Sequence, residues 1–302
     1  MSGGKGFTES WKPRGATLQT IEHANEVFDE YRDHLPLTLR QVFYALVARH
    51  GYQKTEAGYK RLSNVLTNAR RAGLVPMRYL RDDGAVRDGG GGGYRDKSEF
   101  LEDLKDSARY YCLDKQDDQP IQILVVVESA GMARMVGDVC EPYSVPVLGV
   151  RGFSSLTEKH GLSKWVGRRL ETGGEVALLG LGDLDPSGVS LWEDLCADVA
   201  AFLGDPEHLT FTRTLLTEEQ AEAWNLESAP PKTTDSRSKA WGDRPTFQLE
   251  AVPPDVLSRT VEAAVRANLD LSVLAETLER ERREREELVE MLGTLDLEGW
   301  PT

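Results

Sequence analysis

Three acidic residues follow two apolar segments in a pattern typical of a metal site. Residues 121–127 (IQILVVV) run into Glu128, and residues 176–181 end just before Asp183 and Asp185. Short aliphatic segments of this kind suit buried strands of a parallel sheet, and such sheets bind ligands beyond the carboxyl ends of their strands. Carboxylates at that edge supply the oxygen ligands that Mg²⁺ prefers. We therefore expect Glu128, Asp183 and Asp185 to bind Mg²⁺, with Mn²⁺ as a substitute.

Asp185 also has a purely structural interpretation. Pro186 suits the first position of a helix, so Asp185 could cap a helix that begins there. This interpretation leaves Asp183 and Glu128 unexplained. An Asp-x-Asp pair could also be a phosphatase nucleophile pair, but such enzymes usually place the pair on their first strand, whereas the first strand here ends in Glu128.

Composition and charge predict a folded protein with a basic N-terminal part and an acidic remainder. The chain has 302 residues, of which 40% are hydrophobic, and a net charge of −14. This length and apolar content suffice for cores in two domains. Residues 1–80 hold 12 Lys and Arg against 7 Asp and Glu, so the acidic excess lies after them. A basic module joined to an acidic one is compatible with a localised phosphate-binding face.

The sequence gives no sign of a membrane segment or of an oxidising compartment. Its first residues lack the apolar core of a signal peptide, and the longest aliphatic run, 123–127, is far too short to span a bilayer. Cys112, Cys140 and Cys196 are odd in number and lack metal-ligand spacing, which indicates reduced thiols. We expect a cytoplasmic protein with no membrane partner.

The N-terminal region predicts a helix-turn-helix. Residues 1–16 should be disordered, and apolar spacing over 18–35 predicts a first helix. Thr38 and Gln41 form a capping-box pattern that opens a second helix, which Gly51 ends. A third helix follows and buries an apolar stripe. Its outer face presents five polar side chains: Lys60, Arg61, Asn64, Asn68 and Arg71. Because Arg and Lys neutralise phosphate and Asn pairs with base edges, this face should bind double-stranded DNA; an ordinary solvated face is the alternative.

Tyr44, in the second helix, lies off the apolar stripe of that helix. At about 100° per residue it is about 130° from the centre of the stripe, on the same side as Arg40. A surface-facing phenol beside a guanidinium could attack a phosphodiester, because the cation stabilises phenolate and phosphate charge alike. On spacing alone, an exposed tyrosine with no chemical role is the simpler interpretation.

Five consecutive glycines at 89–93 divide the chain. Such a run behaves as a flexible joint, so we expect a linker over 82–97 between domains at 17–81 and 98–302. The second domain alternates strands and helices, which predicts an α/β fold with a parallel sheet and crossover helices, followed by C-terminal helices. Arg151, after the second strand, could face phosphate near the metal.

Two motifs together resemble a family of DNA-cleaving proteins. A strand-ending Glu followed by Asp183-Leu-Asp185-Pro-Ser-Gly resembles the Toprim domain. Upstream, Arg40-Gln-Val-Phe-Tyr44 resembles the Arg-x-x-x-Tyr element in the winged-helix domain of the topoisomerase VI A subunit and its meiotic double-strand-break relatives. The resemblance covers residues 35–220, and residues 74–80 could supply the wing or a short strand.

The resemblance implies a compact, stand-alone bacterial or mobile-element version of this family, with a winged-helix domain followed by a Toprim domain. Tyr44, assisted by Arg40, would break DNA by forming a 5′-phosphotyrosyl link. Glu128, Asp183 and Asp185 would bind Mg²⁺. In relatives the tyrosine of one protomer meets the metal of the other, which implies a homodimer.

This sequence departs from the family at several points. Ser129 stands where the family usually has Lys, and no ATPase motif is recognisable, so ATP-driven strand passage would need a separate B-type partner subunit. A Toprim nuclease that hydrolyses DNA without a tyrosine, and a DNA-binding regulator without catalysis, are the alternatives. The sequence leaves open whether Glu250 binds metal or caps a helix.

Overall fold

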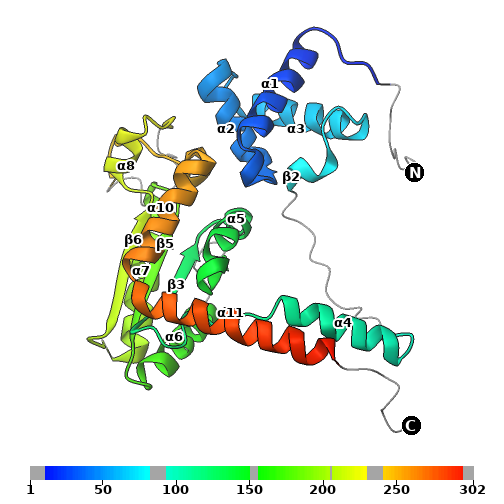
Figure 1. Ribbon diagram of the computed structural model, residues 1–302. Helices are drawn as coiled ribbons and strands as arrows, with labels where there is room; N and C mark the ends of the chain where they lie inside the picture. The colour runs from blue at the N-terminus through cyan, green and yellow to red at the C-terminus, as the bar shows by residue number, and fades with distance from the viewer. Residues whose placement is uncertain (1–10, 82–92, 150–155, 205, 230–240, 295–302) are drawn as a thin grey trace.

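The computed structural model describes residues 11–81, 93–149, 156–204, 206–229 and 241–294. It is a mixed α/β protein, in which a helical N-terminal unit precedes a four-stranded parallel sheet with helices on both faces (Figure 1). Among the described helices, none is both long and apolar enough to cross a membrane.

Three helices build the N-terminal unit: α1 (Ala16–Glu30), α2 (Leu39–His50) and α3 (Glu56–Arg71). The capping box at the start of α2 is present, since Thr38 Oγ1 accepts a hydrogen bond from the Gln41 N–H while the Gln41 side chain accepts one from the Thr38 N–H. The helix ends at Gly51, whose φ of 61° lies in the left-handed region that glycine adopts without strain.

Short elements connect these helices to the rest of the chain: η1 (Arg32–His34), β1 (Leu37–Thr38), η2 (Met77–Tyr79) and β2 (Leu80–Arg81). The strands β1 and β2 pair in parallel, so the segment 74–80 leads into a short strand and contains no hairpin. Trp11, within the segment expected to be disordered, packs against the core. Of the expected linker, residues 82–92 lie outside the described residues.

Four parallel strands form the main sheet in the order β4-β3-β5-β6: β3 (Ile121–Val127), β4 (Val147–Gly149), β5 (Glu175–Leu181) and β6 (Leu209–Leu215). The central strands β3 and β5 pair in register, with Val127 opposite Leu181. Glu128 and Asp183 therefore follow neighbouring strands at the same edge of the sheet.

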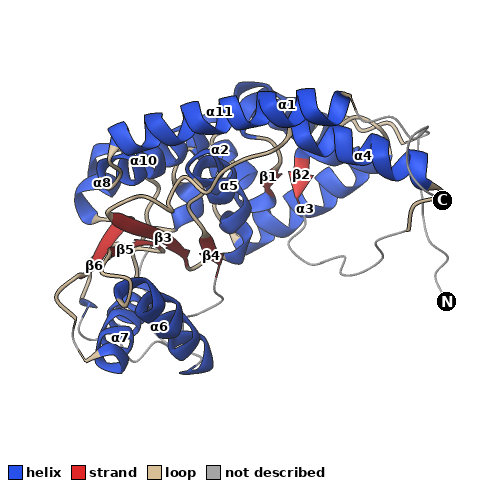
Figure 2. Ribbon diagram, turned by 60° about the horizontal axis from the view of Figure 1, so that its bottom comes forward, coloured by secondary structure: helices blue, strands red, loops and turns tan. Residues whose placement is uncertain are grey.

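Different helices cover the two faces of this sheet (Figure 2): α5 (Ala130–Cys140) and α10 (Pro254–Ala267) on one face, α6 (Leu156–Leu170) and α7 (Pro186–Leu203) on the other. Successive side chains of a strand point to opposite faces, so Val125 packs in the core with α5 and α10, whereas Val126 packs with α6 and α7. The core on the α5 side also contains the apolar side chains of the N-terminal helices. The two units thus share one hydrophobic core.

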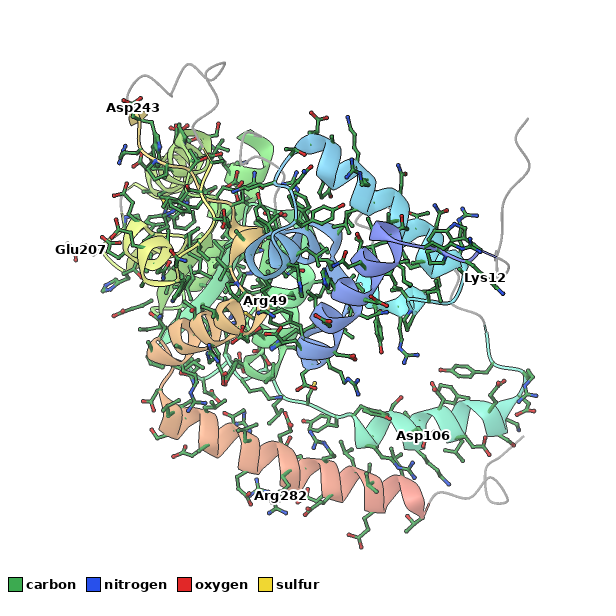
Figure 3. All side chains as sticks on the ribbon, turned by 90° about the horizontal axis from the view of Figure 1, so that it is seen from above. Lys12, Arg49, Asp106, Glu207, Asp243 and Arg282 are labelled. Atoms are coloured by element: carbon green, nitrogen blue, oxygen red, sulfur yellow. The ribbon has the colours of Figure 1, made fainter. Side chains whose placement is uncertain are left out.

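The helices α4 (Lys97–Arg109) and α11 (Leu271–Gly293) pack side by side and extend away from the sheet (Figures 1 and 3). We call this pair the α4–α11 arm; Asp106 and Arg282 mark its helices in Figure 3. On α4, Leu101 is buried, whereas Phe100 and Leu104 are exposed. A single partner helix covers a narrower apolar stripe than a sheet does, which accounts for the difference.

After the sheet the chain passes through α8 (Glu218–Ala223) and returns to the carboxyl edge of the strands. There Phe247 forms an antiparallel bridge with Leu184, in the loop after β5. This bridge places the 3-10 helix η4 (Leu249–Ala251) beside that loop. A second short helix, η3 (Glu141–Tyr143), follows α5.

Candidate functional site

Four carboxylates lie at the carboxyl edge of the sheet. Glu128 follows β3, Asp183 and Asp185 follow β5, and Glu250 belongs to η4. Glu128 Oε2 accepts a hydrogen bond of 3.1 Å from the Asp183 N–H. Asp183 Oδ1 accepts one of 2.8 Å from the Leu249 N–H. These bonds tie β3, the loop after β5 and η4 together, although the three segments are far apart in the sequence.

Two glycines make room for the Glu128 side chain. A Cβ atom at Gly182 would lie 2.6 Å from Glu128 Oε2, and one at Gly188 would lie 2.4 Å from the Asp183 carbonyl oxygen. Contacts this short are far inside ordinary van der Waals separation. The Gly-Asp-x-Asp-x-x-Gly spacing of residues 182–188 therefore allows the glutamate to reach across to the neighbouring strand.

Asp185 caps α7, as its structural interpretation predicts. Its Oδ1 accepts a hydrogen bond of 2.7 Å from the Gly188 N–H, and Pro186 occupies the first turn of the helix. A carboxylate has two oxygens, and the cap uses one of them. Capping and metal binding by Asp185 are therefore compatible.

Arg213 of β6 supports the loop that carries Asp183. Its guanidinium donates hydrogen bonds to four carbonyl oxygens, those of Asp183 at 2.5 Å, Leu216 at 3.1 Å, Gly182 at 3.2 Å and Gly188 at 3.4 Å. These bonds fix the loop, and the positive charge offsets part of the acidic charge. The sequence interpretation missed this residue, for which the only signal is one charged side chain within LTFTRTL.

The acidic charge at this edge is only partly compensated. Burial, followed by the charge of Glu250, raises the pKa of Asp183 to about 7. Burial likewise raises the pKa of Glu128. Buried acids that disfavour one another's ionisation in this way are typical of functional sites, including those that bind cations.

The described side chains do not form a closed metal-ligand set: no group of three or more His, Cys, Asp or Glu residues in the described ranges is arranged to hold an ion. Glu128, Asp183 and Asp185 each direct one oxygen to a backbone N–H, and each carboxylate has a second oxygen. The donors nevertheless suit Mg²⁺ in kind, because that ion binds to one or two carboxylates together with water and phosphate oxygens. Glu128, Asp183 and Asp185 could supply such ligands, with Glu250 as a fourth.

Helix α2 brings Tyr44 and Arg40 to the same edge. The Tyr44 hydroxyl donates a hydrogen bond of 2.7 Å to Gln248 Oε1, and an Arg40 nitrogen lies 4.0 Å from Glu250 Oε1. The expectation of a surface-facing phenol is wrong: Tyr44 is half-buried, because α2 packs against η4 as well as against its own unit. Burial raises the pKa of Tyr44 to about 12, although the charge of Arg40 opposes the rise.

Glu250 does not cap a helix. It is buried in η4, three residues before the proline that serves as the N-cap of α10. Its Oε1 accepts a hydrogen bond of 3.0 Å from Ser129 Oγ, which belongs to the residue directly after Glu128. The structure therefore places Glu250 among the acids of the candidate site.

The residues expected to contact DNA lie on α3, apart from Arg151, which lies outside the described residues. Lys60, Arg61, Asn64 and Asn68 are exposed and Arg71 is half-buried. Lys60 forms a 2.6 Å ion pair with Glu56, one turn earlier on the same face. The buried face of α3 is the predicted one, made of Leu62, Val65, Leu66 and Ala69.

Comparisons with known proteins identify no relative: no family model, curated protein or solved structure matches this chain. Its function must therefore be inferred from the residues and their geometry.

Proposed function

We propose that this protein is a Mg²⁺-dependent DNA-cleaving enzyme of the topoisomerase VI A-subunit type, in which Tyr44 breaks DNA by transesterification. The observation that carries the proposal is the position of the tyrosine. Its hydroxyl is hydrogen-bonded to Gln248, two residues before Glu250, at the edge where Glu128 and Asp183 lie. A phenol and several carboxylates at one site are the groups that such a reaction requires.

In the proposed reaction the Tyr44 oxygen attacks the phosphorus of a DNA phosphodiester. A bond forms between that oxygen and phosphorus, the bond from phosphorus to the 3′ oxygen breaks, and the tyrosine proton passes through solvent to the released 3′ oxygen. Gln248 holds the hydroxyl in position before attack. Arg40, one turn away on α2, stabilises negative charge on the phenolate and phosphate. Glu128, Asp183 and Asp185 would hold Mg²⁺, which would supply further stabilisation of negative charge.

The architecture supports this proposal at the level of domains. A parallel sheet with acids after its two central strands is compatible with a Toprim-type domain, and the α2–α3 pair is compatible with the helix-turn-helix of a winged-helix domain. In this arrangement double-stranded DNA binds along the polar face of α3. ATP-driven strand passage would require a separate B-type subunit.

Two other functions each have an observation in their favour. A hydrolytic nuclease is favoured by the half-buried Tyr44 hydroxyl, whose pKa is raised to about 12, because water could then be the nucleophile. A DNA-binding regulator without catalysis is favoured by the lack of a closed metal-ligand set among the described side chains.

Denaturing gels of labelled duplex DNA incubated with Mg²⁺ or Mn²⁺ test the proposal. We expect the wild-type protein to leave protein-linked DNA and Tyr44→Phe to reduce that product on the order of a thousand-fold or more. Tyr59→Phe is a matched control. Both tyrosine rings pack edge-on against Phe43, with ring centroids 5.7 Å apart for Tyr44 and 5.4 Å apart for Tyr59. Because Tyr59 lies on α3, Tyr59→Phe should cleave normally.

The same experiment separates the three functions. Normal cleavage by Tyr44→Phe would exclude the tyrosine as the nucleophile and identify a hydrolytic nuclease. Absence of cleavage by the wild-type protein, together with DNA binding that survives in Glu128→Ala and Asp183→Ala, would identify a regulator.

A further inference from the structure

We propose that a groove between α6 and α7 binds single-stranded DNA, with a base stacked on Phe202 and the backbone attracted to Lys164 and Arg168. The groove has a volume of about 370 Å³, within the range of pockets that bind small molecules and cofactors. It lies on the face of the sheet away from α5 and α10 (Figure 2), whereas the N-terminal helices share the core on the α5 side. This inference is therefore independent of the cleavage site and of the polar face of α3.

The floor of the groove is formed where the two helices approach each other closely. A Cβ atom at Gly167 of α6 would lie 3.2 Å from Leu203 Cδ2 of α7, so a glycine at this position favours the close approach. Ser163, one turn earlier, is buried and donates its hydroxyl to the His160 carbonyl oxygen at 2.9 Å. Because that hydroxyl already has its acceptor, recognition depends on the side chains at the rim.

Two cations stand at this rim. Lys164 and Arg168 are exposed and lie one turn apart on α6, so they project on the same side of the helix. Neither forms an ion pair with any residue that the structure describes. Glu171 is the one acid among the described residues that line the groove, which leaves an excess of positive charge on a chain whose net charge is −14. Such an excess suits a phosphate backbone.

Other basic side chains of α6 are engaged in the fold. Lys159 is buried and forms an ion pair of 2.6 Å with Asp198 of α7. The Arg169 guanidinium lies over the ring of Trp165, 5.8 Å from its centroid. The contrast along one helix separates the cations that hold α6 in place from the two that face the groove.

An exposed aromatic ring forms the α7 side of the groove. Phe202 is 46% exposed, and its ring lies 5.3 Å from that of His160 with 57° between the two planes. An aromatic ring beside cations is the arrangement with which proteins bind single strands, because every base has a face that can stack. In a duplex the neighbouring base pairs cover those faces, so the ring favours a single strand over a duplex.

Fluorescence anisotropy of a labelled oligothymidylate of about twelve nucleotides tests the inference, with the full chain in EDTA to prevent Mg²⁺-dependent cleavage. Phe202→Ala should weaken binding about tenfold, and Phe202→Trp should retain it. Lys164→Ala combined with Arg168→Ala should lower the slope of log affinity against log salt by about 1.4, because each phosphate contact to a single strand contributes about 0.7. Arg169→Ala is the matched control and should leave the affinity unchanged, because that side chain lies over Trp165.

Four results would overturn the proposal. The first is a wild-type protein that does not bind the oligonucleotide, and the second is an unchanged affinity in Phe202→Ala. The third is an equal loss of affinity for a duplex of the same length in Phe202→Ala, which would exclude base stacking as the cause. The fourth is displacement of the oligonucleotide by thymidine monophosphate at equal concentration, which would identify a site for free nucleotides. None of these results bears on protein-linked cleavage of duplex DNA, which is measured separately.

Discussion

Two regions of this protein bury carboxylates, and the pKa of the buried acid is shifted in opposite directions in the two regions. In the α4–α11 arm, Glu281 accepts hydrogen bonds from the Lys115 ammonium group, from the Arg285 guanidinium at 2.5 Å and from the Leu113 N–H at 2.8 Å. Burial by itself raises the pKa of Glu281, but these partners, with Lys115 first, outweigh burial and hold the pKa below its ordinary value.

At the carboxyl edge of the sheet the balance is reversed. Asp183 accepts a hydrogen bond from the Leu249 N–H and lies among Glu250, Glu128 and Asp185, and its pKa is raised to about 7. The nearby cation, Arg213, donates its hydrogen bonds to backbone carbonyl oxygens.

The difference shows what each region is adapted to do. The arm neutralises its buried acid with two cations, as a structural site requires. At the sheet edge the negative charges of the acids repel one another, and this repulsion lowers the stability of the folded protein. Such unfavourable arrangements persist where the chemistry of a site uses them, and a divalent cation would relieve this one.

Removing one charge from each region should change stability in opposite directions. Asp183→Asn should stabilise the protein against urea at pH 8 without divalent cations, by up to about 4 kcal/mol, since the pKa rises from 3.8 to about 7 and each unit is worth about 1.4 kcal/mol. Glu281→Gln should destabilise it by roughly 3 kcal/mol, because buried Lys115 loses its partner. The measurement is the free energy of unfolding from urea titrations.

Asp96→Asn is the matched control for this pair, because Asp96 is an exposed helix cap at the start of α4 and Asn is also a good cap. It should change the free energy of unfolding by less than about 0.5 kcal/mol. Loss of stability in Asp183→Asn at pH 8 would contradict the electrostatic difference between the two regions.

Mg²⁺ should stabilise the protein more at pH 8 than at pH 6. The folded protein holds the Asp183 proton more tightly than the unfolded chain does, so stability falls as the pH rises from about 4 to 7. Mg²⁺ competes with that proton, and its apparent affinity should be about tenfold lower at pH 6 than at pH 8. At a Mg²⁺ concentration of about a hundred times its Kd, the stabilisation should be about 3 kcal/mol, measured as the rise in Tm on adding MgCl₂.

Two comparisons control this experiment. KCl of equal ionic strength separates metal binding from charge screening, and Asp183→Asn should lose the pH dependence of the Mg²⁺ effect. An equal rise in Tm at both pH values, or a rise that KCl reproduces, would show that the acids do not share an ion.

Local patterns predicted much of this fold because the interactions behind them are local. The strand β3, the capping box of α2 and the buried face of α3 follow from a short aliphatic segment, capping chemistry and helical spacing. The shared edge of Glu128 and Asp183 follows from a general property of parallel sheets.

The remaining parts of the site depend on contacts between distant segments. The antiparallel bridge between Phe247 and Leu184 brings Glu250 to the site, although Leu184 lies more than sixty positions earlier in the sequence. Helical spacing places Tyr44 off the apolar stripe, but it cannot reveal that η4 packs on that flank of α2. For the same reason, the apolar spacing of α4 cannot reveal that its partner is α11, near the other end of the chain. Periodicity reports which face is apolar and not which element covers it.

The smallest predicted effect concerns one arginine on α3 and one in the α4–α11 arm. An acidic edge repels DNA, so the basic face of α3 must supply the attraction to phosphate. Arg61→Ala should weaken duplex binding by about 1 kcal/mol, roughly fivefold, and reduce the salt dependence by about one counterion. Arg282→Ala in the α4–α11 arm should do neither, because Glu279 and Glu286 already neutralise that guanidinium.

Fluorescence anisotropy of a labelled duplex across a KCl series measures both quantities. The Asp183→Asn background prevents cleavage during the titration, and Arg61→Lys should restore the salt slope because it restores the charge. If Arg282→Ala lowers the salt slope while Arg61→Ala does not, DNA binds along the arm. The acids at the sheet edge would then lie far from the duplex that they are proposed to cleave.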